Sequence, residues 1–209
     1  MNKTKSIYTL SIIAVIFALT PYLMGSSTLE EHNDSHKEKS STPNVPKEIT
    51  FAGERITFDR YDKREKMDRE LISFCFMHTN SHLIIKRANR YFPVIEPILK
   101  ENNIPDDLKY LMVIESSMNP FARSVAGAAG FWQFMPATGR EYGLEVNKNI
   151  DERYHIEKST VAACKYLKDA YAKFGDWISA TASYNAGQAR IATELQKQGV
   201  KDASELWLV

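Results

Sequence analysis

The sequence predicts an all-α fold. From Asp68 onwards, apolar residues recur at intervals of three and four, the spacing that one face of an α-helix requires. Proline and glycine stand at the ends of these apolar stretches. Only residues 49–58 alternate in the manner of a strand, and that segment is short. A chain whose periodic segments are nearly all helical belongs to the all-α class.

The apolar stretches predict helices over residues 68–75, 88–99, 105–119, 135–143, 161–174, 177–183 and 190–198. Pro105 opens the third helix, because the first helical turn tolerates proline, and Asp106 and Asp107 suit the positive end of the helix dipole. Pro120 ends that helix. Gly175 follows the helix over 161–174 and is a typical helix terminator.

The N-terminus is typical of an export signal. Lys3 and Lys5 precede a stretch without charge, residues 6–29, whose centre is strongly apolar. We therefore expect residues 1–25 to be an export signal or a membrane anchor. Both alternatives stay open, since residues 7–24 have about the 20-residue length that crosses a bilayer and no clear cleavage site follows them.

Residues 26–48 are rich in Ser, Glu, Lys, His and Pro, which predicts a disordered linker. The remainder, about 160 residues, is long enough to bury roughly 68–70% of its surface and to form its own core. The chain has 27 basic and 26 acidic residues. This balance provides no general basic field, so no nucleic acid is expected as a partner.

Cysteine and histidine indicate neither a disulfide framework nor a cofactor site. Cys75 and Cys164 lie in apolar stretches, where buried free thiols are the simpler interpretation and a bridge is the alternative. His78 and His82 are spaced like metal ligands on a helix, but no carboxylate or third ligand accompanies them. We expect no metal and no cofactor.

Glu115 is the candidate catalytic residue. It shares one helix face with Leu108, Leu111 and Met112, and the other faces of the same helix are also apolar. Burial and the negative end of the helix dipole are both expected to raise the pKa of such a carboxyl group, as a general acid requires. The alternative is an ion-paired glutamate at the edge of the core.

Two further segments support a binding site. Residues 127–136 read Gly-Ala-Ala-Gly-Phe-Trp-Gln-Phe-Met-Pro, in which Trp132 offers a ring face to a sugar and Gln133 an amide to an N-acetyl group. Residues 183–187 read Ser-Tyr-Asn-Ala-Gly. Asn185 there suits a turn between helices, while Tyr184 either packs in the core or points its hydroxyl into a cleft.

The Glu115 helix and these two segments, in this order and spacing, resemble the lytic transglycosylases of the soluble and membrane-bound D types, relatives of goose-type lysozyme. Segments upstream, at residues 51–54, 86–90 and 104–111, resemble the D type in particular. The resemblance covers about residues 49–200. It implies a lysozyme-like helical catalytic domain over residues 102–209, preceded by an N-terminal helical extension over residues 49–101.

The resemblance also implies roles for single residues. Glu115 matches the catalytic acid of the family. The positions that match substrate-binding residues are Ser116, Ser124, Gln133, Tyr184 and Asn185, and Trp132 is added to the binding candidates for its ring face. The implied substrate is a peptidoglycan glycan strand, cut between N-acetylmuramic acid and N-acetylglucosamine with formation of a 1,6-anhydro ring. The implied location is the periplasm or cell envelope, and the oligomeric state stays open.

Two other functions remain as alternatives. A goose-type lysozyme would add water instead of closing the ring, and a hydrolase with two carboxylates would need a second acid, for which Asp151, Glu152 and Asp176 are the candidates. A protein that binds glycan without cutting it, or serves as a scaffold, is the second alternative. The D-type pattern continues with a tyrosine-bearing block that is absent before Val209, so we expect a truncated C-terminal end.

Overall fold

The computed structural model describes residues 43–207, apart from the side chains of His78 and Thr79, and the expected export signal and most of the expected linker lie outside this range. The elements follow in the order β1 (Glu48–Phe51), β2 (Glu54–Thr57), α2 (Tyr61–Phe76), α3 (His78–Glu101), the 3₁₀ helix η1 (Asp106–Tyr110), α4 (Leu111–Ser116), α5 (Pro136–Glu141), the 3₁₀ helix η2 (Glu152–Tyr154), α6 (Ile156–Phe174), α7 (Trp177–Ala186) and α8 (Gln188–Gln198). The prediction of a mainly helical fold is confirmed. No helix within the described range is long and apolar enough to cross a bilayer.

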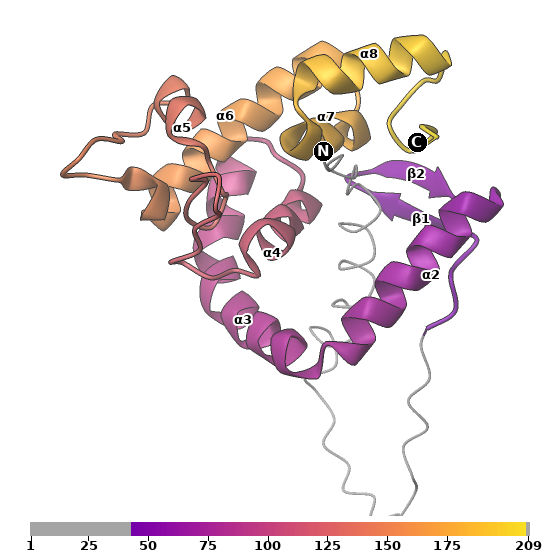
Figure 1. Cartoon of the computed structure of the whole chain (residues 1–209), viewed down its shortest axis with the longest axis horizontal. Coiled ribbons are helices and arrows are strands. Elements are labelled where there is room, and N and C mark those ends of the chain that lie inside the picture. The colour runs from indigo at the N-terminus through magenta and orange to yellow at the C-terminus, as the bar shows by residue number, and fades with distance from the viewer. Residues whose placement is uncertain (1–42, 208–209) are drawn as a thin grey trace, which may run out of the picture.

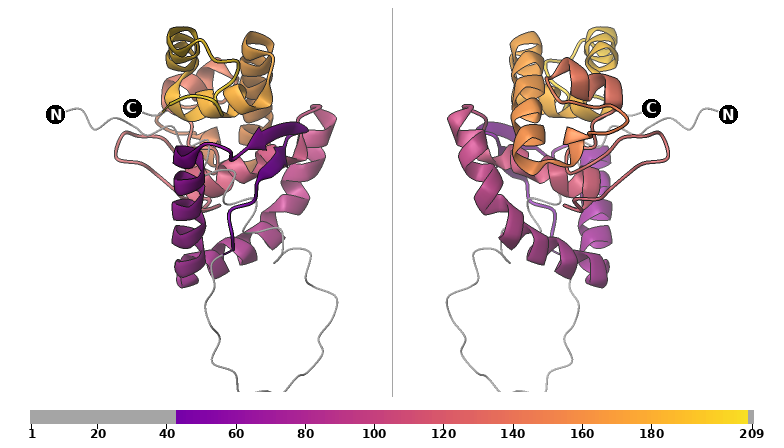
Figure 2. Two further views of the ribbon diagram at one scale, coloured as in Figure 1. Left: turned by 90° about the vertical axis from the view of Figure 1, so that its right-hand side faces the viewer. Right: turned by 90° about the vertical axis from the view of Figure 1, so that its left-hand side faces the viewer.

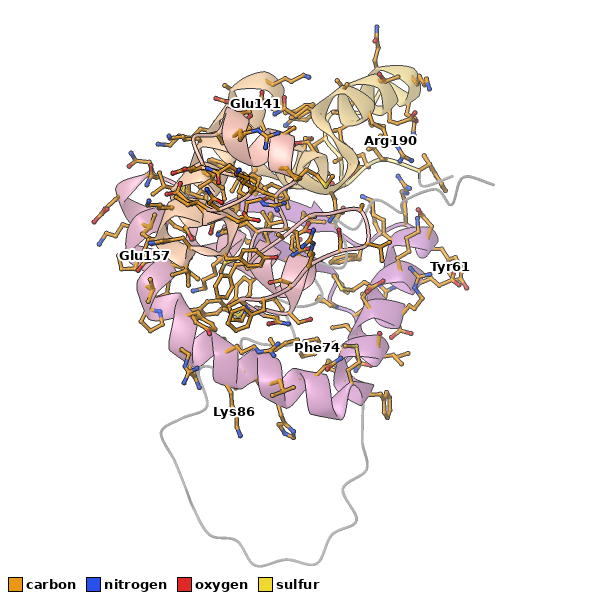
Figure 3. All side chains as sticks on the ribbon, turned by 60° about the vertical axis from the view of Figure 1, so that its left-hand side comes forward. Tyr61, Phe74, Lys86, Glu141, Glu157 and Arg190 are labelled. Carbon is orange, nitrogen blue, oxygen red and sulfur yellow. The ribbon has the colours of Figure 1, made fainter. Side chains whose placement is uncertain are left out.

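Helices α2 and α3 form the two arms of a V, and α4 lies between them (Figure 1). The antiparallel β1–β2 hairpin lies across the arms near the open end of the V (Figure 2). Phe74 of α2 is buried, whereas Tyr61 and Lys86 point outwards from the two arms (Figure 3). Helices α5 to α8 close the open end, so α4 is enclosed by elements from both halves of the chain.

Several predicted helix starts are wrong, since α3 begins at His78 rather than at residue 88 and α6 at Ile156 rather than at residue 161. Helix α2 begins at Tyr61, seven residues before Asp68. The prediction misses this start because the first two turns carry mainly charged residues and the buried positions become regular only from Met67. The segment after Pro105 opens with the 3₁₀ helix η1 rather than an α-helix. Its α-helical continuation ends at Ser116, ahead of Pro120, and Ser117 follows in the left-handed conformation with φ 50°.

Helix α3 runs through two prolines, Pro93 and Pro97, without ending. Each proline removes one backbone donor from the helix, which normally disfavours a helix interior. The predicted apolar face is nevertheless buried at the expected spacing. Its members are Ala88, Phe92, Ile95 and Leu99. Burial of this face against η1 and α6 offsets the missing donors.

Helix α7 is the centre of the C-terminal half. Its residues 178–183 are all buried, and apart from Ile178 they are Ser, Ala and Thr. Such small side chains allow close approach of the neighbouring helices, α6 and α8, which both pack on α7 (Figure 1). Gly175 ends α6 in the left-handed conformation, as predicted, and Asp176 caps the first turn of α7.

Both cysteines are free, but only Cys164 is buried as expected, whereas Cys75 is partly exposed. Cys164 is buried in α6, and burial raises the pKa of its thiol to about 11. The described residues contain no group of three or more His, Cys, Asp or Glu side chains that would hold a metal ion.

Candidate functional site

The carboxyl group of Glu115 stands at the end of a buried helix. Leu111, Met112 and Val113 of α4 lie in the core, whereas Glu115 itself is half-buried. This is the predicted arrangement, in which an acid ends an apolar stripe. At the end of α4, Arg87 of α3 donates from Nη1 to the carbonyl oxygen of Ser117 at 3.0 Å. A cation there suits the negative end of the helix.

Two adjacent residues at the end of α7 connect Glu115 to the loop after α4. Asn185 donates from Nδ2 to Glu115 Oε1 at 3.0 Å. Tyr184 donates from its hydroxyl to the carbonyl oxygen of Trp132 at 2.8 Å. Burial raises the pKa of the Tyr184 hydroxyl well above its usual range, and the negative charge of Glu115 adds to this rise. Tyr184 therefore stays protonated and keeps donating.

The ring of Tyr184 is held by three other aromatic side chains. The ring centroids of Trp132, Phe134 and Tyr166 lie 6.4, 6.0 and 4.9 Å from its own. The structure combines the two alternatives for Tyr184. Its ring packs in the core, and its hydroxyl donates a hydrogen bond to the loop of residues 127–136, called the motif loop below. The three segments singled out in the sequence therefore meet at one place.

Trp132 does not have the position expected of a sugar platform. Its side chain is fully buried, with 0% exposure. Its indole Nε1 donates to Thr160 Oγ1 of α6 at 3.0 Å. A ring enclosed on both faces cannot stack on a sugar, so the expected role of Trp132 is corrected to that of a core residue. Towards Tyr184 it presents both its ring and its backbone carbonyl group.

Gln133 and Ser124 both brace the loop that contains them. Gln133 has a left-handed backbone, with φ 48°, and its Nε2 donates to the carbonyl oxygens of Gly130 at 2.8 Å and Ala122 at 3.1 Å. Ser124 Oγ accepts a hydrogen bond from the backbone N–H of Ala128 at 3.0 Å. Ser116, which is buried, donates from Oγ to the Met112 carbonyl within α4.

Arg153 is the main support of this loop, and nothing in the sequence identified it. Its buried guanidinium donates to the carbonyl oxygens of Gly127 at 2.7 Å and Phe134 at 2.9 Å, which lie at opposite ends of the motif segment. Asp151 pairs with the same guanidinium through Nε at 2.8 Å and Nη2 at 2.7 Å. The buried guanidinium therefore holds the two ends of the loop together.

The backbone of Arg153 also touches the loop. A Cβ atom built on Gly130 would lie 1.9 Å from the carbonyl oxygen of Arg153, and the φ of Gly130 is +78°. Only glycine fits such a close approach in this conformation. Gly130 therefore lets the motif segment pack directly on η2.

The three acids considered as a second catalytic carboxylate are all occupied elsewhere. The paired Arg153 guanidinium holds the pKa of Asp151 below its usual range. Glu152 accepts from the backbone N–H of Glu145 at 2.8 Å and pairs with Lys158, and these contacts lower its pKa. Asp176 accepts from the N–H of Ser179 at the start of α7. Glu115 is thus the acid that the motif segments bring together with an amide donor.

Comparison with protein families gives a match over the second half of the chain. Residues 92–207 match the family model described as the transglycosylase SLT domain. The matched region begins inside α3 and includes Glu115, the loop around Gly130 and the Tyr184–Asn185 pair. More than half of the chain is covered.

Curated relatives agree with this match. The membrane-bound lytic murein transglycosylase D of Escherichia coli K12 is 34% identical over 146 residues, which are 69% of this chain and 31% of that protein. A putative tributyltin chloride resistance protein of Alteromonas sp. is 32% identical over 106 residues, 50% of this chain and 51% of that protein. The soluble lytic murein transglycosylase of Salmonella typhimurium is 33% identical over 94 residues, 41% of this chain and 15% of that protein. The chain thus spans about a third of the length of its D-type relative.

Proposed function

The chain belongs to the transglycosylase SLT family, and we propose that it is a peptidoglycan lytic transglycosylase that cuts glycan strands between N-acetylmuramic acid and N-acetylglucosamine. Two of its relatives carry the name lytic murein transglycosylase. The observation on which this proposal mainly depends is the position of Glu115, half-buried at the end of α4 and hydrogen-bonded by Asn185.

In the proposed reaction Glu115 acts first as an acid and then as a base. Its carboxyl group gives a proton to the glycosidic oxygen, so the bond from this oxygen to C1 of the muramyl residue breaks. The resulting carboxylate takes the proton of the muramyl C6 hydroxyl, whose oxygen bonds to C1 and closes the 1,6-anhydro ring. The proton returns to Glu115, and no water is consumed.

The occupied state of the other acids supports one catalytic carboxyl group over two. Hydrolases with two carboxylates need the second group free, either as a nucleophile or as a base for water. Asp151 and Glu152 are engaged in ion pairs, and Asp176 caps α7. Ring closure needs no second carboxylate, because the substrate supplies the nucleophile.

We also propose that Ser116, Ser124 and Gln133 contribute to glycan binding, as their matching positions in the family imply. Gln133 and Ser124 are partly exposed, so a ligand reaches them without unfolding the loop. For the domain arrangement we keep residues 102–209 as the catalytic domain and residues 49–101 as its helical extension. The family match begins ten residues earlier, within α3.

The test is the mass of the products released from purified sacculi. The wild-type protein is expected to release muropeptides that are lighter by one water than the products of hydrolysis. Glu115→Gln keeps the volume and an oxygen acceptor for Asn185 but has no proton to give, so release should fall by about 10²–10⁴-fold. Glu157→Gln, an exposed glutamate at the start of α6, is the matched control and should release fragments like wild type.

Each other result points to another function. Products with the mass of hydrolysis would indicate a goose-type lysozyme. Binding to sacculi without released fragments would indicate a glycan-binding or scaffold protein. Release by Glu115→Gln at the wild-type rate would remove Glu115 from the mechanism.

For its location we propose export to the cell envelope, the place where the proposed substrate lies. Lys3, Lys5 and the apolar stretch at residues 7–24 are the basis of this proposal. Fractionation of cells that express the full chain tests it, and recovery in the cytoplasm alone would contradict it. The intact mass of the recovered protein then separates a cleaved signal from a retained inner-membrane anchor.

A further inference from the structure

The β1–β2 hairpin is tied by two acidic side chains to two distant elements. At the hairpin turn, the backbone N–H of Ala52 donates to Asp107 Oδ2 of η1 at 2.7 Å. From β2, Glu54 accepts two hydrogen bonds from the first turn of α7. Its Oε1 accepts from the N–H of Trp177 at 2.6 Å, and its Oε2 accepts from the N–H of Ile178 at 3.1 Å.

The two elements held by the hairpin are the ones that end at the site. Helix η1 continues without a break into α4, which carries Glu115. Helix α7 begins at Trp177 and carries Asn185 in its last turn. The hairpin therefore joins the starts of two helical segments, and the other ends of those segments meet in the hydrogen bond between Asn185 and Glu115.

The hairpin is built as a rigid connection. Phe51, Ile56 and Phe58 are buried in the main core, with at most 1% exposure. The two strands pair in a fixed antiparallel register, and the turn uses left-handed conformations at Ala52, with φ 53°, and Gly53, with φ 81°. A two-residue turn of this kind matches the twist of the strands. A displacement at the Asp107 contact is therefore expected to be transmitted to the Glu54 contact.

Helix capping alone does not account for Glu54. Helix α7 already has its own cap, because Asp176 accepts from the N–H of Ser179 at 2.5 Å. Glu54 binds the two preceding N–H groups from a segment more than 120 residues away in sequence. A local cap needs no such partner. The contact instead fixes where the start of α7 lies relative to η1.

From this geometry we infer that the hairpin sets the placement of Asn185 against Glu115, with Glu54 as the positioning residue. The inference rests on the proposed function in so far as it concerns turnover. A displacement of about 1 Å in a reacting arrangement costs on the order of 10²-fold in rate. Loss of the Glu54 contact is therefore expected to lower kcat while leaving KM nearly unchanged.

Glu54→Gln is the variant to test. Both Glu54 oxygens accept an N–H, but a glutamine has one oxygen and one NH₂ group, which cannot accept from a second N–H. The substitution keeps the volume of the side chain and removes one of its two hydrogen bonds to α7. On soluble glycan fragments we expect kcat to fall by about 10- to 100-fold, with KM within about twofold of wild type. Glu48→Gln, in the same hairpin, is the matched control, because Glu48 is exposed and pairs with Arg55 across the strands.

A second control separates positioning from stability. Glu205→Gln weakens a contact to Lys63 of α2, a helix that carries neither Glu115 nor Asn185. It should lower Tm without lowering kcat, provided that rates are measured at a temperature where each variant is fully folded by circular dichroism. A Glu54→Gln protein that loses Tm but keeps the wild-type kcat overturns the inference.

A third measurement does not depend on catalysis. In ¹⁵N NMR spectra, Glu54→Gln should shift the side-chain amide resonances of Asn185, whereas Glu48→Gln should leave them in place. Unshifted Asn185 resonances in Glu54→Gln overturn the inference. If wild type releases no anhydro products, the proposed function fails, and this spectrum still decides whether the hairpin positions Asn185.

Discussion

At the scale of single residues, the acids near the motif segments divide by the partners that surround them. Glu115 faces an uncharged amide from Asn185, whereas Asp151 faces the guanidinium of Arg153 at two atoms. A carboxylate paired with a buried cation is held ionised and is poorly suited to giving up a proton. The environment of Asp151, rather than its place in the sequence, therefore argues against Asp151 as a general acid.

The pairing of Asp151 predicts a pH dependence of stability. Its pKa in the folded protein lies below the ordinary value of 3.8, so its contribution is present above that value and is lost as the pH falls through the lowered pKa. Asp151→Asn should lower the free energy of unfolding by about 1.5–3 kcal/mol at pH 7. The difference from wild type should shrink below about pH 4. Urea denaturation from pH 7 to pH 2.5 measures it, and a difference that stayed constant over this range would show that the charge of Asp151 contributes nothing.

Tyr184→Phe tests the contact between α7 and the motif loop. The substitution keeps the ring but removes the donor to the Trp132 carbonyl. A buried carbonyl without its donor costs about 1–3 kcal/mol of unfolding free energy. Tyr171→Phe, on the exposed face of α6, is the control and should change stability by less than about 0.5 kcal/mol. Equal stabilities of the two variants in thermal unfolding would contradict the proposed importance of the contact.

At the scale of elements, the sequence predicts what depends on local spacing. The helix over 161–174 is found, with its end at Gly175, because an apolar face and a glycine terminator are local signals. The start of α2 is missed, since charged turns carry no apolar pattern. The short alternating segment is found as a hairpin of two strands, which a single short stretch of alternation does not reveal.

The same limit applies to the candidate site. Glu115, Tyr184 and Asn185 are brought together as expected, because each lies in a recognisable segment. The burial of Trp132 depends on Thr160 of α6, a contact between residues far apart in the sequence. Arg153 and Glu54 act through similarly distant contacts with backbone groups, which have no side-chain identity to read from a sequence.

Two glycines in the motif loop provide a matched prediction. Gly127 and Gly130 both have positive φ, but a Cβ on Gly127 would meet nothing within 4 Å, whereas one on Gly130 would collide with the Arg153 carbonyl. Gly127→Ala should therefore cost only the backbone strain, about 1–2 kcal/mol. Gly130→Ala should cost roughly 4 kcal/mol or more and abolish release of muropeptides. Similar losses of Tm in the two variants would show that the contact between the loop and η2 is less tight than the structure indicates.

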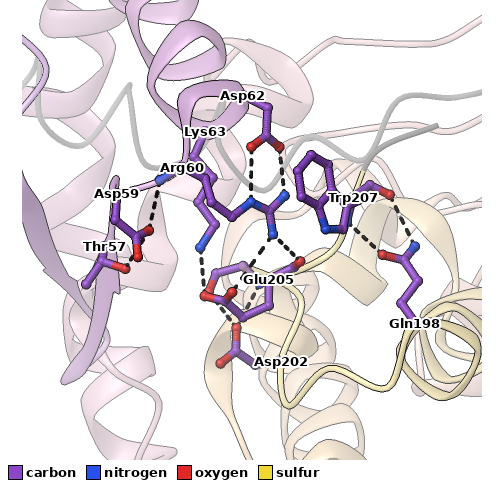
Figure 4. Close-up of polar contacts among 10 residues, drawn as sticks. Thr57, Asp59, Arg60, Asp62, Lys63, Gln198, Asp202, Glu205 and Trp207 are labelled. Carbon is purple, nitrogen blue, oxygen red and sulfur yellow. Dashed lines mark hydrogen bonds and ion pairs between the residues drawn. The ribbon is translucent and has the colours of Figure 1, made fainter.

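At the scale of the whole molecule, residues 203–207 return to the start of α2 (Figure 4). Lys63, with a side chain only 2% exposed, donates to Glu205 Oε1 at 2.7 Å. Arg60 donates to the backbone carbonyl of Glu205 at 2.7 Å, and its guanidinium lies 3.8 Å from the ring centroid of Trp207. These contacts link positions more than 140 residues apart, so they join the first helix of the described fold to its last segment.

Glu205→Gln tests this link against an ordinary surface ion pair. The substitution keeps an oxygen for Lys63 but removes the charge that compensates a buried ammonium group. Because Glu205 itself is 42% exposed, solvent screens part of the effect, and we expect a loss of about 1–2 kcal/mol rather than the 3–5 kcal/mol of a fully buried pair. Glu194→Gln breaks the exposed pair with Lys197 and should cost less than about 0.5 kcal/mol. The loss in Glu205→Gln should also persist in 1 M salt, since salt screens exposed charges far more than buried ones. Equal losses in the two variants under urea denaturation, or a loss in Glu205→Gln that disappears in salt, would mean that the return of residues 203–207 to α2 depends on the burial of Leu206 and not on the charge of Glu205.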